Sequence, residues 1–174
     1  MTLDQIDVVV VGAGMSGLMA AMAAKSNDNR VLIVEPSNVL GGQGTAGGVS
    51  GFCGDSNRVN RLFRELIDRL AEHGFISDYN PNDDRRAYDL EWCAYFLQEM
   101  VLERDIEVLL HSRVIDACEV DGRVTELTIS TAGGLYKCRP GFVIDASGIC
   151  VVPHILGYPV VAEGADKHLP MGLY

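Results

Sequence analysis

Hydrophobic and polar positions over the first 35 residues predict a strand, a helix and a second strand in close succession. Residues 6–11 form an apolar run interrupted only by Asp7, which is typical of a strand buried on both faces of a sheet. Residues 15–26 are rich in Ala and Met, which favour a closely packed helix. Residues 31–34 form another apolar run, so the chain opens with a predicted β–α–β unit.

Two helices are predicted in the middle of the chain. In residues 57–73, apolar residues recur at spacings of three and four with charged residues between them. This pattern indicates an amphipathic helix, and Gly74 is suited to end it. Residues 75–88 are polar and turn-prone. Asp89 can then cap a second helix over residues 90–104.

The second half of the chain predicts further strands. Residues 106–110 and 142–144 are short apolar runs that indicate buried strands. Between them, three segments of alternating apolar and polar residues are separated by Gly-containing turn signals; these segments are 113–119, 123–130 and 135–139. The predicted fold class is therefore α/β, with a central parallel sheet and an antiparallel three-stranded meander.

A glycine motif joins the first predicted strand to the first helix. Gly12, Gly14 and Gly17 match G-x-G-x-x-G, in which the glycines permit a tight turn, a close approach of backbone to a pyrophosphate, and close helix–strand packing. Glu35 ends the second strand, where a carboxylate accepts hydrogen bonds from ribose hydroxyls and disfavours a 2′-phosphate. We therefore predict a dinucleotide site that does not take NADP. The alternative is a glycine turn of purely structural use.

A second glycine-rich segment, residues 41–54, follows the predicted unit. Its seven glycines cannot serve a regular element, while Thr45, Val49 and Phe52 are interspersed among them. We interpret this segment as backbone laid against a flat ligand. A flexible linker is the alternative.

Composition narrows the class of partner. The chain has 174 residues, which suits one domain. Its net charge of −10 argues against nucleic acid or an anionic membrane as a partner. No apolar run has the length of a membrane span, and residues 1–5 have no signal-peptide pattern, so we expect a cytoplasmic protein. Five scattered cysteines without a C-x-x-C pair predict reduced thiols and no metal site.

These features together resemble the FAD-dependent oxidoreductases of the glutathione-reductase structural class. The resemblance is carried by the Gly12 motif, by Glu35, by the predicted meander and by Asp145-Ala146-Ser147-Gly148, which is similar to the family's second flavin motif. Within the class, residues 41–52 look most like the large group known simply as FAD-dependent oxidoreductases. The resemblance implies FAD as the cofactor and a Rossmann-like FAD-binding domain.

The resemblance also implies a role for individual residues. The pyrophosphate would be held by Gly12, Gly14, Gly17 and the amides of Met15 and Ser16. Glu35, followed by Pro36, would bind the adenosine ribose, and Val114 would meet adenine through its backbone. The residues expected along the pyrophosphate toward the isoalloxazine ring are Gly42, Gln43 and Thr45, and those expected to close over the nucleotide are Ala146, Ser147 and Gly148.

Two departures from the family pattern qualify these roles. Ile149-Cys150 stands where the family often has an acid, which puts a role for this turn near the flavin in doubt. The chain also stops about where the family's substrate domain begins. We therefore expect an FAD-binding domain over residues 1–150 that lacks the substrate domain, and an apolar extension over residues 151–174 that packs on a partner chain.

The leading functional hypothesis is the FAD-binding subunit of a split flavoenzyme. A second polypeptide would supply the substrate domain and the rest of the flavin site, and the substrate would be a small organic molecule. A fragment produced by proteolysis or gene decay is the alternative origin. Two other function classes stay open: an FAD carrier that passes electrons without contacting substrate, and an NAD-binding domain without flavin.

Few side chains are candidates for chemistry. Cys53 is either a flavin-linked or redox thiol or a small buried thiol. His154 and His168 lie in the apolar C-terminal segment and could reach a shared active site. We assign no general acid or base, and no metal.

Overall fold

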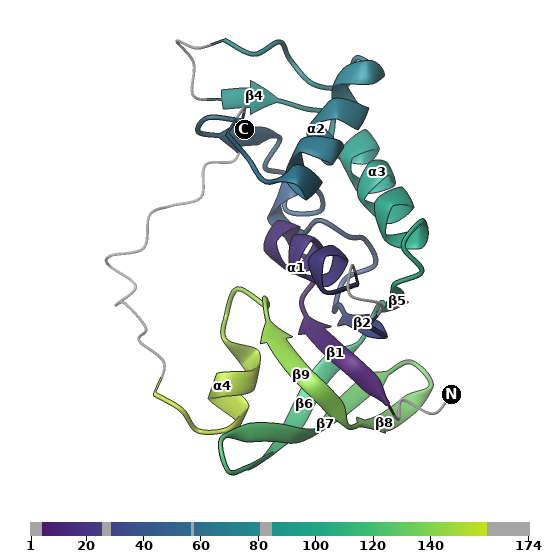
Figure 1. Ribbon diagram of the computed structural model, residues 1–174, viewed down its shortest axis with the longest axis vertical. Helices are drawn as coiled ribbons and strands as arrows, with labels where there is room; N and C mark the ends of the chain where they lie inside the picture. The colour runs from purple at the N-terminus through teal and green to yellow at the C-terminus, as the bar shows by residue number, and fades with distance from the viewer. Residues whose placement is uncertain (1–4, 26–28, 57, 81–84, 160–174) are drawn as a thin grey trace.

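The computed structural model describes residues 5–25, 29–56, 58–80 and 85–159. Its centre is a parallel sheet with the strand order β5-β2-β1-β9 (Figure 1). The four strands are β1 (Ile6–Val11), β2 (Val31–Val34), β5 (Glu107–Leu109) and β9 (Pro140–Asp145). β1 lies between β2 and β9, and Val9 is in register with Leu32 on one side and Val143 on the other.

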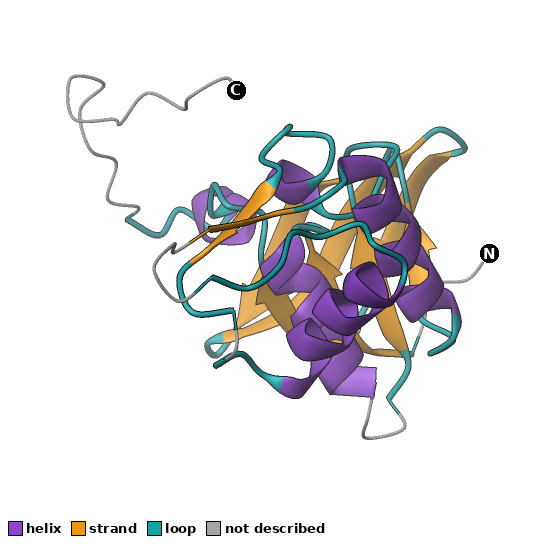
Figure 2. Cartoon of the chain, turned by 90° about the horizontal axis from the view of Figure 1, so that it is seen from above, coloured by secondary structure: helices purple, strands orange, loops and turns teal. Residues whose placement is uncertain are grey.

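Three helices cover one face of this sheet. They are α1 (Met15–Lys25), α2 (Arg61–Glu72) and α3 (Leu90–Leu102), and Figure 2 shows them gathered on one side of the strands. Val8 and Val10 of β1 belong to the core on this side. The predicted three-stranded meander covers the other face, where it packs against Val9 and Val11. Its strands are β6 (Arg113–Val120), β7 (Arg123–Thr131) and β8 (Gly134–Cys138).

The two packed layers explain why β1 is apolar at successive positions. Neighbouring side chains in a strand point to opposite faces, and each face of β1 meets its own hydrophobic core. The predicted fold class, α/β with a parallel sheet and an antiparallel meander, is confirmed.

Smaller elements complete the described chain. The glycine-rich segment contains a single 3₁₀ turn, η1 (Gly42–Gly44), and a short strand, β3 (Gly51–Cys53), which pairs with β4 (Arg85–Ala87). A short helix, α4 (Val151–Ile155), follows β9. The flexible-linker alternative for residues 41–54 is therefore wrong, because this segment is built into the fold.

Several boundaries differ from those predicted. α2 begins at Arg61 rather than near position 57, because the Asn60 side chain accepts a hydrogen bond from the Phe63 N–H at 2.9 Å and caps the helix there. The expected burial of β9 is wrong for Phe142, which is 67% exposed, because β9 is an edge strand of the sheet. Of the expected C-terminal extension, residues 160–174, including His168, lie outside the described residues.

Candidate functional site

Glycine is required at one position in the turn after β1 and at one position in the first turn of α1. Gly12 has a φ of 98°, and a Cβ atom there would lie 2.7 Å from the Ala146 carbonyl oxygen. A Cβ atom on Gly17 would lie 2.1 Å from the Gly12 carbonyl oxygen. Gly12 therefore lets the turn touch the segment after β9, and Gly17 lets α1 lie against the turn.

Gly14 differs from these two glycines. A Cβ atom on Gly14 would meet no protein atom within 4 Å, and its backbone is not in the left-handed region. The space over Gly14 is therefore open, and it lies at the N-terminus of α1, where the first N–H groups have no partner within the helix. A helix N-terminus with an open approach suits an anionic group such as a pyrophosphate.

The glycine-rich segment lies directly on this turn. The Gly41 N–H donates a hydrogen bond to the Ala13 carbonyl at 2.8 Å, and Gly14 and Gly41 form an isolated parallel bridge. A Cβ atom on Gly42 would come within 3.0 Å of Gly14 Cα. Two stretches of nearly bare backbone thus meet at one edge of the sheet, as the flat-ligand interpretation requires.

Tyr88 fixes the far end of the same loop. Its hydroxyl lies 2.9 Å from the Gly44 carbonyl and 2.8 Å from the Val49 carbonyl, and its single proton is shared between these two acceptors. Burial is the main reason why the pKa of Tyr88 is raised, with smaller contributions from Cys93 and Cys53. The hydroxyl therefore keeps its proton and stays a donor.

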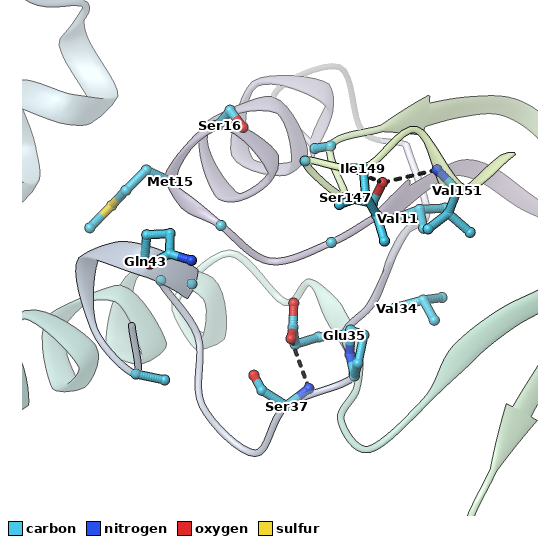
Figure 3. Close-up of a pocket in the computed structure, with 18 of the residues that line it drawn as sticks. Val11, Met15, Ser16, Val34, Glu35, Ser37, Gln43, Ser147, Ile149 and Val151 are labelled. Atoms are coloured by element: carbon cyan, nitrogen blue, oxygen red, sulfur yellow. Dashed lines mark hydrogen bonds between the residues drawn. The ribbon is translucent and has the colours of Figure 1, made fainter. Parts of the chain in front are cut away.

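Glu35 is buried at the end of β2 and is only 8% exposed. One carboxylate oxygen accepts the Ala13 N–H at 2.7 Å. The other accepts the Ser37 N–H at 2.8 Å, as Figure 3 shows. A carboxylate offers about four lone-pair sites, so Glu35 can hold the turn and still accept hydrogen bonds from a ligand.

The segment after β9 is held by its own side chains. Asp145 accepts the Ser147 N–H at 2.9 Å with one oxygen and the Val152 N–H at 2.7 Å with the other. The Ser147 hydroxyl accepts the Val151 N–H at 3.1 Å, and Figure 3 shows it beside the first turn of α4. This network fixes residues 146–148 against the Gly12 turn.

These segments surround one cavity of about 970 Å³, which is at the upper end of the range for ligand sites. Most of the residues predicted for FAD line it: Gly12, Gly14, Met15, Ser16, Glu35, Pro36, Gly42, Gln43, Val114, Ala146, Ser147 and Gly148. Glu35 and Arg113 are the only lining residues, within the described chain, that carry a charge at neutral pH.

Two predicted residues do not line the cavity. Gly17 packs against Gly12 behind the turn. Thr45 is buried, and its hydroxyl donates to the Leu40 carbonyl at 2.6 Å. Both residues therefore support the loops that form the cavity, and the structure does not bring Thr45 to its surface.

Sequence reasoning missed several lining residues, nearly all within two positions of predicted ones. Ser37 follows the Glu35-Pro36 pair, Ser112 and Arg113 precede Val114, and Ile149 follows Gly148. Their side chains match no motif. Adjacency to the predicted positions, at strand ends that share one edge of the sheet, was the available signal.

Of the candidate chemical side chains, Cys53 and His154 do not line this cavity. Cys53 is exposed on β3, so the interpretation as a buried thiol is wrong, and Cys53 lines a second, smaller cavity. His154 is on α4 and lines neither of these two cavities. Over the described residues, no group of three or more His, Cys, Asp or Glu residues could hold a metal ion.

A membrane-spanning helix is also missing from the described ranges, where no helix combines the necessary length and apolar character.

The curated proteins that the chain resembles include the following two. It is 28% identical over 162 residues to an uncharacterized protein in the nifH2 5′ region of Methanosarcina barkeri, with 82% of each chain covered. It is 27% identical over 167 residues to the protein FixC of Escherichia coli K12, with 86% of this chain covered. The chain spans only 38% of the length of that FixC protein.

Solved structures share the fold. A geranylgeranyl bacteriochlorophyll reductase-like protein from Thermoplasma acidophilum matches with a TM-score of 0.67 and 19% identity, over 90% of this chain and 43% of that one. THI4 from Thermovibrio ammonificans matches with a TM-score of 0.65 and 23% identity, over 88% of this chain and 62% of that one. The described fold is therefore one that larger proteins contain as a part.

The geometry of the cavity fits a cofactor that carries adenine, a ribose and a pyrophosphate. The open space over Gly14, the adjoining backbone of Gly41 and Gly42, and the buried Glu35 carboxylate suit an adenine dinucleotide. The model of the family described as FAD dependent oxidoreductase matches residues 7–170. This chain belongs to the FAD-dependent oxidoreductase family, and its cofactor is FAD.

Proposed function

We propose that this chain binds FAD along the 970 Å³ cavity and forms the FAD-binding part of a flavin-dependent oxidoreductase. The observation that carries the proposal is the convergence of five segments, spread between residues 11 and 151, on one cavity. These are the Gly12 turn, the Glu35 strand end, the glycine-rich loop, residues 112–114 and the segment after β9. The alternative of an NAD-binding domain without flavin loses its support, because the family that the chain belongs to is FAD-dependent.

Different residues bind different parts of the cofactor. The amides at Gly14, Met15 and Ser16 bind the pyrophosphate, where no side chain stands in the way. Glu35 accepts hydrogen bonds from the adenosine ribose with the lone pairs that are not occupied by the N–H groups of Ala13 and Ser37. Val114 contacts adenine.

The other residues act on the rest of the cofactor. Gly42 and Gln43 follow the cofactor toward the isoalloxazine ring, and residues 146–148 close over the nucleotide. The flavin, when bound, supplies hydride or electron transfer. The chain's own contribution is to bind and orient the cofactor, and we assign no residue as acid or base.

We further propose that the enzyme is completed by another polypeptide, which supplies the substrate domain for a small organic substrate. Two findings support this: the chain spans 38% of the FixC protein of Escherichia coli K12, and it matches the Methanosarcina barkeri protein over 82% of both. The cysteines of the described chain form no disulfide bond with one another, which suits the reducing cytoplasm, where we place the protein. A non-catalytic FAD carrier is the second candidate.

One series of experiments tests both proposals, the binding of FAD and the completion of the enzyme by a partner. The purified chain is titrated with FAD, and the quenching of flavin fluorescence and the flavin absorption bands are followed. Saturable binding supports the proposal. A chain that is colourless once the excess FAD has been removed contradicts it. The native protein is then isolated with any bound partner. Bleaching of the flavin by candidate substrates identifies an enzyme, whereas a flavin that is bleached by a chemical reductant but by no candidate substrate identifies a carrier.

A further inference from the structure

A second cavity, of about 310 Å³, adjoins the FAD cavity and is lined in part by β3. Met15 and Gly44 line both cavities. A Cβ atom on Gly44 would lie 2.6 Å from Met15 Cε and 2.9 Å from the Tyr88 hydroxyl oxygen. These three residues are therefore in close contact and form the wall between the two cavities.

The second cavity has an aromatic side. The rings of Phe52 and Tyr88 are stacked with their centroids 4.1 Å apart, and the edge of Phe63 meets Phe52 at 4.8 Å. All three residues line the cavity, together with Val49 and Val59. Such a surface favours an apolar, flat ligand.

One polar side chain that lines this cavity is buried without a hydrogen-bond partner among the described residues. Ser56 is 3% exposed and lines the cavity, and its hydroxyl has no hydrogen-bond partner among the residues that the structure describes. Buried hydroxyls are normally paired, because an unpaired one keeps the cost of its lost hydration. The Ser56 hydroxyl is thus suited to pair with a group that enters the cavity.

The charge of the cavity restricts that group further. Asp55 is the one acidic side chain that lines it within the described residues, and it forms an ion pair with Arg58 at 3.4 Å. No cationic side chain lines the cavity within the same residues, so an anionic ligand would lack a compensating charge, whereas a neutral molecule needs none.

We infer that this cavity binds a neutral molecule of about one aromatic ring, bearing a single hydroxyl or carbonyl group that pairs with Ser56. Its wall is shared with the FAD cavity, so it serves as the substrate subsite of the proposed oxidoreductase. This last step rests on the proposed function, whereas the binding itself does not.

The test uses phenol as the probe and toluene as its analogue without a hydroxyl. Both are titrated into the full chain, and the backbone amide signals are followed by nuclear magnetic resonance. We expect phenol to shift the amides of Cys53 and Ser56 saturably. Ser56→Ala should weaken phenol binding about tenfold, as expected for the loss of one buried hydrogen bond, and leave toluene binding unchanged. Ser130→Ala, on β7 and outside both cavities, is the control that should change neither.

The inference is overturned if phenol leaves the amides around Ser56 unshifted, or if Ser56→Ala binds phenol as tightly as the unmodified chain. FAD titration of the same samples separates this result from the proposed function. Absence of FAD binding with phenol binding intact would reject the proposed function and the role as substrate subsite, and would keep only the binding site for a neutral molecule. Intact FAD binding without any effect of Ser56 would reject the subsite alone.

Discussion

The Glu35 carboxylate, at the end of β2, accepts a hydrogen bond of 2.7 Å from the backbone N–H of Ala13, in the turn after β1. Its second oxygen accepts the Ser37 N–H. The residue that sequence reasoning assigns to the ribose therefore also fixes the shape of the pyrophosphate turn. In the proposed FAD site, one buried side chain would therefore join the recognition of adenosine to that of the pyrophosphate.

We predict that Glu35→Gln destabilises the protein as well as weakening FAD binding. The amide side chain has only one acceptor oxygen, so its NH₂ group must face either the Ala13 or the Ser37 N–H. The free energy of unfolding should fall by about 1–3 kcal/mol, as for a lost hydrogen bond to a buried charged group. Urea denaturation measures this. Glu72→Gln, on the exposed end of α2, is the matched control, and equal stability of the two variants would contradict the prediction.

Gly14→Ala should separate folding from cofactor binding. The new methyl group meets no protein atom, so the free energy of unfolding should stay the same or rise by up to about 1 kcal/mol. The methyl group enters the space that the pyrophosphate needs, so FAD affinity should fall at least about tenfold, or about 1.4 kcal/mol. Gly51→Ala, which also has room and an ordinary φ, should keep FAD affinity. A Gly14→Ala chain that binds FAD normally would contradict the assignment of the turn.

Tyr88→Phe should loosen the glycine-rich loop. The substitution keeps the ring that stacks on Phe52 but removes the hydroxyl shared by the Gly44 and Val49 carbonyls. We expect a loss of about 1–3 kcal/mol in the free energy of unfolding and faster hydrogen exchange of the Val49 amide. The exchange of amides in β7, far along the chain in the meander, should stay unchanged. Uniform acceleration in both regions would point instead to global destabilisation.

Replacement by alanine should change the free energy of unfolding differently at two buried serines. Ser56 has no partner for its hydroxyl within the described chain, whereas the Ser112 hydroxyl donates to the Leu110 carbonyl at 2.8 Å. Without added ligand, Ser56→Ala should leave the free energy of unfolding unchanged or raised. Ser112→Ala should lower it by about 1 kcal/mol. Thermal melts of both variants, run side by side, check the sign.

Thiol labelling should divide the cysteines into two classes. Cys53, Cys118 and Cys150 are exposed, whereas Cys93 and Cys138 are buried. Burial, with a smaller contribution from Asp89, raises the pKa of Cys93 to about 12. At pH 9 the exposed thiols should therefore be alkylated in the folded chain, while Cys93 stays protonated and unreactive until the chain unfolds. Mass spectrometry after alkylation reads out each site, and labelling of folded Cys93 at pH 9 would contradict the burial.

The layers of the fold could be predicted because local pattern and tertiary environment agree. Apolar runs such as residues 6–11 become central strands, and the Asp89 side chain caps α3 by accepting the N–H groups of Glu91 and Trp92. β4 could not be predicted, because Arg85–Ala87 has no apolar alternation and is a strand only through its pairing with β3. The exposure of Phe142 depends on which strand lies at the sheet edge, and local sequence does not encode that order.

The candidate site was predictable where glycine or a carboxylate has a specific geometric task. Gly12, Gly14 and Glu35 are such positions, and all three line the cavity. Thr45 carries no such constraint, and it turned inward to the Leu40 carbonyl. Cys53 was misjudged because β3 was not foreseen: once Phe52 faces the core, the alternation of a strand turns its neighbour outward.

The scarcity of charged groups around the large cavity has a consequence for ionic strength. A site that neutralised the two cofactor phosphates with several lysines would weaken steeply in salt, because screening acts on exposed charges. In the proposed site main-chain dipoles take the place of those lysines, and Arg113 is the one cationic side chain among the described lining residues. Cofactor retention should therefore hardly change between dilute buffer and molar sodium chloride, even in a protein with a net charge of −10.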